Sequence, residues 1–192
     1  MLKKSLAIGA LSLTALLATG VASAQNLYVG GTVGQSKWNE ECRSFTKCDT
    51  KGTAIKLVGG YNFNKNFAFE TSLFSLGKID ASLPLSNSIV GSESKGGGID
   101  FSGVAKVDFT DEFGGFLKLG VARTSTTTKR TFANNTLFSQ DSTTTQPIGA
   151  LGLTYKVAKD WALRGEFETR RVKLGAAKEN VNTFSVGMQY SF

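Results

Sequence analysis

The sequence predicts an all-β fold, an eight-stranded antiparallel up-and-down transmembrane β-barrel. Apolar residues recur at every second position through eight segments, each longer than the five or six residues of an ordinary strand. Short connections alternate with long polar ones along the chain. Within each segment the charged side chains keep to one face, and a charge facing lipid at mid-bilayer costs about 2–4 kcal/mol. Together these three patterns indicate a closed barrel in a membrane.

Residues 1–24 are expected to form a cleaved secretory signal peptide. Two lysines precede an apolar run over 6–18, and the segment ends in the small-x-small pattern Ala22-Ser23-Ala24. The alternative, a transmembrane anchor, is disfavoured because the run is short for a span and is interrupted by Ser and Thr. Residues 25–192 then form a single barrel domain.

The expected strands and connections follow in order along this domain. The strands cover residues 27–36, 53–63, 67–77, 97–109, 115–128, 143–157, 160–172 and 181–192. The short connections are 64–66, 110–114 and 158–159, and the long polar loops are 37–52, 78–96, 129–142 and 173–180. All short turns then lie at one barrel end and all long loops at the other, as in barrels of bacterial outer membranes. We therefore expect an integral protein of the outer membrane.

The assignment of each strand rests on the same alternation of apolar and polar residues, which has a period of two. The first alternates from Leu27 to Val33, and the sixth places Gly152 on the polar face, where a narrow interior needs small residues. The apolar faces of the other six carry, in order, Ile55 and Leu57, Phe69 and Leu73, Ile99 and Phe101, Leu117 and Leu119, Trp161 and Leu163, and Val186 and Met188. These faces are expected to contact lipid.

Aromatic residues on the apolar face gather near the short turns. They are Tyr61, Phe63, Phe67, Phe109, Trp161, Tyr190 and Phe192. Rings at this level of a barrel form the aromatic girdle at a membrane interface. The sequence therefore predicts the periplasmic girdle at the short-turn end.

Several stretches resemble the OmpA-like transmembrane domain family of eight-stranded barrels. The most specific runs from Leu57 to Glu70 and continues to Leu76-Gly77, and Gly98–Phe101, Gly152–Tyr155 and Ala162–Glu166 are similar to later strands of the family. The final residues, with Tyr190 and Phe192, resemble the carboxyl-terminal signal that the barrel-assembly machinery recognises. The resemblance implies the barrel fold and that assembly route.

Charged residues of the polar face are expected to form an ion-pair network in the lumen. They are Lys56, Lys106, Lys118 and Arg164 with Glu70, Asp100, Glu166 and Glu168. Unpaired charges in a narrow interior are expensive, so the four cations and four anions should pair. The resemblance implies Glu70 and Arg164 as a central pair. We interpret the network as a structural plug rather than a gate, because an eight-stranded interior is just wide enough for its own side chains.

Other functional classes are disfavoured. The sequence has no His, which removes the commonest general base and zinc ligand, so we expect no enzyme activity, no metal and no cofactor. A soluble lipid-binding barrel needs an apolar lumen and a polar exterior, the inverse of this pattern. Nothing in the sequence indicates nucleic-acid binding.

The loops carry the remaining expectations. Cys42 and Cys48 are predicted to form a disulfide in the first long loop of an exported protein. Thr- and Ser-rich loops either present an adhesive surface to an unidentified ligand or are simply solvated.

A basic rim near the ends of the fifth to seventh strands is a possible site for lipopolysaccharide phosphates. Its residues are Arg123, Lys129, Arg130, Arg170, Arg171 and Lys173. A solvated rim without a ligand is the alternative, because loop charges usually face water. The role expected overall is structural, in envelope integrity and loop display. A surface adhesin or host-interaction protein is the alternative, and a narrow channel is a weaker one.

Overall fold

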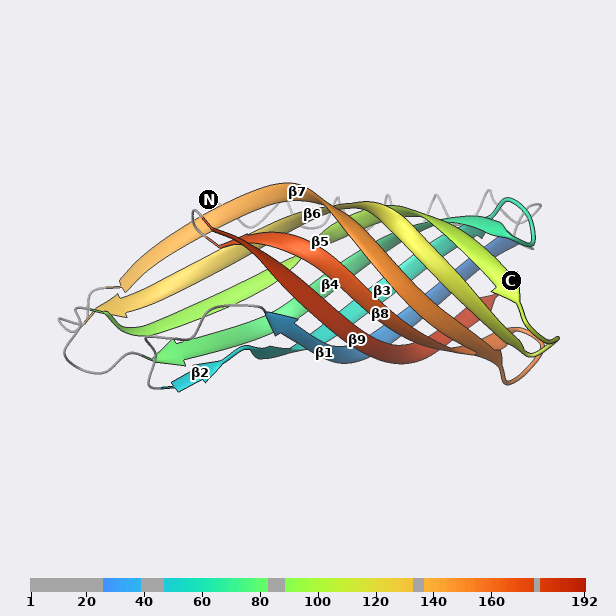
Figure 1. Cartoon of the computed structure of the whole chain (residues 1–192), viewed down its shortest axis with the longest axis horizontal. Coiled ribbons are helices and arrows are strands. Elements are labelled where there is room, and N and C mark those ends of the chain that lie inside the picture. The colour runs from blue at the N-terminus through green and yellow to red at the C-terminus, as the bar shows by residue number, and fades with distance from the viewer. Residues whose placement is uncertain (1–25, 39–46, 83–88, 133–136, 175–176) are drawn as a thin grey trace, which may run out of the picture.

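The structure is a closed antiparallel β-barrel (Figure 1), which confirms the predicted fold class. It is a computed structural model that describes residues 26–38, 47–82, 89–132, 137–174 and 177–192. The long strands follow one another around the barrel, with β4 beside β5 like the other sequential neighbours, and the pairing of β9 with β1 closes it. Within the described residues, no helix has the length and apolar character needed to cross a membrane.

Eight long strands form the wall, and a short ninth element extends it. The long strands are β1 (Leu27–Trp38), β3 (Lys51–Asn62), β4 (Phe67–Ser82), β5 (Ile89–Asp108), β6 (Phe113–Phe132), β7 (Leu137–Lys156), β8 (Trp161–Leu174) and β9 (Ala177–Ser191). The short element is β2 (Lys47–Asp49), which pairs with the far end of β4. It lies inside the expected loop 37–52, so part of that segment is strand.

Short turns join the strands at one end of the barrel, on the right of Figure 1. In the first turn, Asn64 Oδ1 accepts hydrogen bonds from the backbone N–H groups of Asn66 and Phe67, at 2.9 and 2.8 Å. In the second, Thr110 Oγ1 accepts them from Glu112 and Phe113, at 3.3 and 3.0 Å. Asn and Thr stabilise turns in this way because their side chains replace missing backbone partners.

Strands β5, β6 and β7 extend well beyond their expected ends. Each has 20 residues, and they project at the left of Figure 1. The expectation that 78–96 and 129–142 are loops is therefore wrong for most of both segments. The β5–β6 and β6–β7 ladders run unbroken through Thr and Ser residues. These residues lack the apolar alternation that marks a strand, although β-branched Thr suits a pleated sheet.

Pro147 marks the place where β7 separates from β8. The β7–β8 ladder ends at the pair Ile148–Arg170, whereas β7 stays paired with β6 through Val121 opposite Pro147. Proline has no N–H group to give to a ladder, so it suits a position with one free edge. Beyond this point the wall is open between β7 and β8, while β5 stays paired with β4 up to the pair Ala81–Ser92.

Apolar side chains cover the outside of the closed wall. Leu57 is 60% exposed, and Leu119 and Leu151 are each 62% exposed. Near the short turns the rings contact one another: the Trp161–Tyr190 and Tyr190–Phe192 centroids are both 5.0 Å apart. An apolar band that ends in aromatic rings is the surface that lipid requires.

Two expectations fall outside the described residues. The signal peptide, 1–24, belongs to the part of the chain that the structure does not describe. Cys42 also lies there, and for Cys48 only the backbone is described. Signal cleavage and the disulfide therefore stay predictions.

Candidate functional site: the charged lumen

Arg164 and Glu70 form the centre of the lumen. Their strands, β8 and β4, lie on opposite sides of the barrel, and both side chains point inward because they occupy the polar face of their strands. Arg164 donates from Nη1 to Glu70 Oε1 at 2.6 Å and from Nη2 to Glu70 Oε2 at 3.0 Å. The Tyr28 hydroxyl donates to the same carboxylate at 2.7 Å. This two-pronged geometry fixes both side chains across the barrel.

Two lysines connect the other carboxylates to this pair. Lys56 Nζ lies 2.5 Å from Glu166 Oε1 and 2.5 Å from Glu168 Oε2. Lys118 Nζ lies 3.2 Å from Glu70 Oε2 and 3.7 Å from Asp100 Oδ1. The Lys118 and Glu70 side chains have no solvent exposure. The pairs therefore form one continuous buried network.

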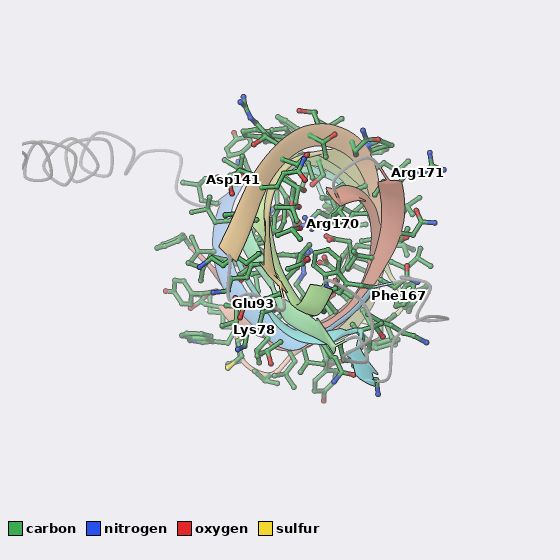
Figure 2. The ribbon with its side chains drawn as sticks, turned by 90° about the vertical axis from the view of Figure 1, so that its left-hand side faces the viewer. Lys78, Glu93, Asp141, Phe167, Arg170 and Arg171 are labelled. Atoms are coloured by element: carbon green, nitrogen blue, oxygen red, sulfur yellow. The ribbon has the colours of Figure 1, made fainter. Side chains whose placement is uncertain are left out.

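Arg170 belongs to this network and not to the outer rim. Its side chain is 1% exposed, and it donates to Glu168 and lies 3.5 Å from Asp100 Oδ2. Its guanidinium carbon lies 3.6 Å from the centre of the Phe74 ring. Figure 2, which looks into the barrel from the long-strand end, shows Arg170 inside and Arg171 outside. The rim assignment was wrong because it considered only that Arg170 lies near the strand end. It ignored the alternation of inward and outward positions along β8, which places Arg170 on the same inward face as Arg164.

Lys106 was expected in the network and lies apart from it. Its Nζ donates to Asn62 Oδ1 at 2.6 Å and sits 4.3 Å from the centre of the Tyr28 ring. Within the described residues, no ion pair joins it to a carboxylate. Lys106 lies two residues before the end of β5 and lines the open space at the short-turn end, where the Asn62 amide oxygen is its partner.

The charge cluster therefore has four cations and four anions, with Arg170 in place of Lys106. Its members are Lys56, Lys118, Arg164, Arg170, Glu70, Asp100, Glu166 and Glu168. These charges cancel. The cluster holds its side chains in ion pairs, and its carboxylates accept hydrogen bonds from the lysines and arginines. Among the described residues, no group of three or more His, Cys, Asp or Glu side chains is placed to hold a metal ion.

Apolar side chains enclose the charge cluster on both sides. Toward the short turns lies a lower layer of Tyr28, Val58, Ala68, Val104 and Phe116. Toward the long strands lies an upper layer of Trp38, Phe74, Leu76, Ile79, Ala122, Ile148, Val172 and Val181. The sequence interpretation missed both layers because it treated the inward face as polar. The sequence did carry a sign of them, since most of these apolar residues occupy even-numbered positions, as the charged inward residues do.

An open vestibule lies below the lower layer, at the short-turn end. Its volume is about 460 Å³, and Lys106, Lys156, Asp108 and Asp160 are among its lining residues. Arg164 reaches its inner end and stacks 4.2 Å from the centre of the Phe116 ring. The Phe116 ring and the Arg164–Glu70 pair thus line the inner end of the vestibule.

The remaining residues of the expected rim divide into two groups. Arg123, Lys129 and Arg171 are exposed on the outside of β6 and β8. The backbones of Arg130 and Lys173 lie in the same two strands, but their side chains are outside the described part of the structure. At the other end, Phe192 is 54% exposed beside Tyr190.

Comparison with known proteins decides the family. The family model of the OmpA-like transmembrane domain matches residues 22–192. The chain belongs to this family. A search of curated protein sequences gives no match.

Solved structures with the same fold include three β-barrel proteins. Neisserial surface protein A (NspA) is 13% identical, with a TM-score of 0.59, 86% of this chain covered and 97% of that one. OprG of Pseudomonas aeruginosa is 17% identical, with a TM-score of 0.57 and coverages of 88% and 97%. Ail of Yersinia pestis, solved with the heparin analogue sucrose octasulfate, is 16% identical, with a TM-score of 0.56 and coverages of 87% and 97%. The family and the shared fold identify this chain as an integral outer-membrane barrel.

Proposed function

We propose that the protein is a structural barrel of the outer membrane with a plugged lumen, supporting envelope integrity and displaying its long strands at the cell surface. One observation carries this proposal: eight ion-paired side chains fill the lumen between two apolar layers. Its partners on this view are the surrounding lipid, including lipopolysaccharide, and the barrel-assembly machinery. The role requires no catalytic step.

The closed lumen disfavours a conducting channel on physical grounds. An ion crossing this interior has to pass the Arg164–Glu70 pair, whose side chains are 3% and 0% exposed. Moving either partner aside leaves the other charged and buried, at a cost of about 3–5 kcal/mol. Both apolar layers have to open as well. The arrangement therefore favours a wall element over a pore.

Conductance in planar bilayers tests the plug. We expect the purified, folded barrel to add no steady current to that of the bare membrane. Heat-dependent gel mobility of the same sample shows whether the barrel is folded before insertion. A steady current that scales with salt concentration would overturn the plug and favour the narrow channel.

A deletion strain tests the envelope role against the adhesin alternative. The alternative rests on the extension of β5–β7, whose exposed hydroxyl groups offer a binding surface. We expect a strain lacking the protein to become sensitive to detergent, and both the full protein and a form trimmed at the Ser125–Thr143 pair to restore resistance. Normal resistance in the deletion strain, with attachment to host cells lost in the trimmed form, would favour the adhesin.

Tyr190 and Phe192 are proposed to act during assembly. We expect Phe192→Ala to lower the yield of folded barrel in cells while refolding in detergent, which needs no assembly machinery, proceeds as in the wild type. Leu27→Ala, at the exposed start of β1, is the matched control. An equal loss in detergent would assign Phe192 to stability instead.

A further inference from the structure

A shallow groove lies on the lipid-facing surface of β5, β6 and β7, close to the short turns. Its volume is about 410 Å³. Six of its lining residues form two rows across the three strands, Ala105–Leu117–Leu151 and Val107–Gly115–Leu153. The middle residue of the second row is a glycine, so no side chain separates Val107 from Leu153. Since neighbouring strands lie roughly 4.8 Å apart, the backbones of β5 and β7 are roughly 10 Å apart across Gly115.

Apolar side chains enclose the groove around Gly115. Val107, Leu117 and Leu153 are each about half exposed on the outside of the barrel. The Phe109 ring lies on the side of the short turns, and a Cβ atom added to Gly115 would be 3.0 Å from Phe109 Cε2. Phe109 in turn contacts Phe113, with ring centroids 5.6 Å apart. The groove is thus apolar and ends at the aromatic girdle, where lipid headgroups begin.

The turn next to the groove carries more negative than positive charge. It joins β5 to β6 and contains Asp111 and Glu112, which are both exposed. Glu112 Oε2 accepts a hydrogen bond from Thr110 Oγ1 at 3.4 Å, and within the described residues neither carboxylate forms an ion pair. The nearby cation is Lys156 at the end of β7, whose Nζ donates to the backbone oxygen of Asp111 at 2.9 Å. Two carboxylates therefore lie beside one ammonium group.

The distance between the turn and the groove matches the arrangement of a phospholipid. Gly115 follows Glu112 by three residues. With a rise of roughly 3.4 Å per residue and a strand tilt of about 40°, the groove lies roughly 8 Å deeper in the membrane than the turn. Short turns face the periplasm in barrels of this kind, so the turn lies among the headgroups of the inner leaflet. Two further charges near this end, Lys106 and Asp108, are opposite in sign and line the vestibule inside the barrel.

We propose that the groove binds an acyl chain of a phospholipid with an ethanolamine headgroup, whose ammonium group lies at Asp111 and Glu112. Gly115 leaves room for the chain, and the apolar walls favour it over water. The two carboxylates favour the ammonium group, and Lys156 beside them suits the headgroup phosphate. A glycerol headgroup brings no cation to this turn. The inference needs only the membrane location of the barrel, and it adds one specific lipid to the surrounding lipid of the proposed function.

Native mass spectrometry of the folded barrel in detergent tests the groove. The probes are phosphatidylethanolamine and phosphatidylglycerol with identical acyl chains, added in equal amounts. Gly115→Val fills the groove, and the matched control Gly59→Val adds the same side chain to the outside of β3, where the nearest atom is 3.9 Å from the new Cβ. We expect Gly115→Val to retain less than half of the lipid that the wild type binds, and the control to bind as the wild type does. Heat-dependent gel mobility shows that each sample is folded, and Gly115→Ala takes the place of Gly115→Val if the larger side chain prevents folding.

Asp111→Asn/Glu112→Gln tests the headgroup. We expect the wild type to bind phosphatidylethanolamine about threefold more than phosphatidylglycerol, the ratio that a weak exposed charge contact gives. The variant should bind the same total amount of lipid without this preference. Glu93→Gln/Asp141→Asn, which removes two carboxylates near the long-strand end, is the control and should keep it.

The outcomes separate the groove from the headgroup. Equal lipid binding by the wild type and Gly115→Val would overturn the groove, and so would an equal loss in Gly59→Val. A wild type without a preference for phosphatidylethanolamine would overturn the headgroup assignment, and so would a preference that survives in Asp111→Asn/Glu112→Gln. Each of these results leaves the conductance and deletion-strain tests of the proposed function unaffected.

Discussion

The same three strands, β5 to β7, pass through two regions that follow different rules. In the lower region their outward residues are apolar, as at Phe101 and Leu117, and they contribute Asp100 and Lys118 to the lumen. In the upper region hydroxyl residues occupy both faces: Thr124 and Thr126 point inward on β6, and Ser125 lies between them on the outside. The backbone ladder is the same in both. The medium outside the wall, lipid or water, therefore sets the side-chain pattern.

The two regions also differ in what holds them together. The lower region has the charge cluster and the two apolar layers. The upper region has exposed side-chain hydrogen bonds, such as Thr127 Oγ1 to Asp141 Oδ1 at 2.7 Å and Thr143 Oγ1 to Ser125 Oγ at 3.3 Å. Exposed polar contacts contribute little because water competes for them. Most of the free energy of unfolding should therefore come from contacts in the lumen. The extension of β5–β7 should depend mainly on the backbone hydrogen bonds of its ladder.

Removing one partner of the central pair should have the largest effect. Glu70→Ala leaves Arg164 and Lys118 without their shared carboxylate in a buried site. We expect a loss of about 3–5 kcal/mol in the free energy of unfolding, measured by urea denaturation in detergent micelles. Glu93→Ala, in the exposed pair with Lys95, is the control from the upper region and should change it by less than about 1 kcal/mol.

A double-mutant cycle isolates the pair itself. Arg164→Ala and the Glu70→Ala/Arg164→Ala double variant complete it. Because the two side chains share two hydrogen bonds, we expect a clear coupling energy. A coupling near zero would contradict a lumen held by this pair and weaken the contrast between the regions.

A charge placed on the outer face should distinguish lipid from water. Leu117 lies on the apolar band of β6, and Ser125 lies on the same face of the same strand in the extension. We expect Leu117→Lys to cost about 2–4 kcal/mol in lipid vesicles and Ser125→Lys to cost close to nothing. Equal losses in reversible unfolding from vesicles would mean that the extension is also in contact with lipid.

Parity alone allowed much of the barrel to be read from the sequence. The alternation at Ile55, Leu57 and Lys56 separates lipid from lumen, because a misplaced charge is expensive in lipid. It also placed Glu70 and Arg164 in the lumen, whereas their pairing was implied by the resemblance to the OmpA-like family. These features depend on chemistry that is local to each strand.

Height within the barrel could not be read in the same way. Parity says that Lys106 and Arg170 point inward, but their partners depend on how far each strand is displaced relative to its neighbours. The upper ends of β5 to β7 were missed because segments such as 91–97 and 139–142 are polar on both faces, and only the ladder to neighbouring strands defines them as sheet.

Small residues in the lumen should matter more than small residues on the outside. A side chain on Gly152 would collide with the Phe116 ring and the carbonyl oxygen of Gly165, whereas one on Gly165 would meet no atom within 4 Å. We expect Gly152→Ala to cost about 1–3 kcal/mol through overpacking of the lower layer, and Gly165→Ala to have little effect. Urea denaturation of the two variants checks this. If Gly165→Ala is the more harmful, packing in the lumen is not what limits the substitution.

The smallest expected effect lies in the extension and should be local. Thr127→Val keeps the β-branched shape and removes the hydroxyl that donates to Asp141. A single exposed hydrogen bond contributes about 0.5–1.5 kcal/mol, and water replaces part of it. Since we expect the extension to open without disturbing the lumen, the midpoint of urea unfolding should stay at the wild-type value.

Amide hydrogen exchange should report the local effect of Thr127→Val. In the upper β6–β7 ladder it should quicken by no more than about tenfold, the equivalent of 1.4 kcal/mol, while exchange around Lys118 stays unchanged. Thr143→Val, which removes the longer contact to Ser125, should change exchange less. A lowered midpoint in Thr127→Val would show that the extension and the lumen unfold together, and the division between the two regions would not hold.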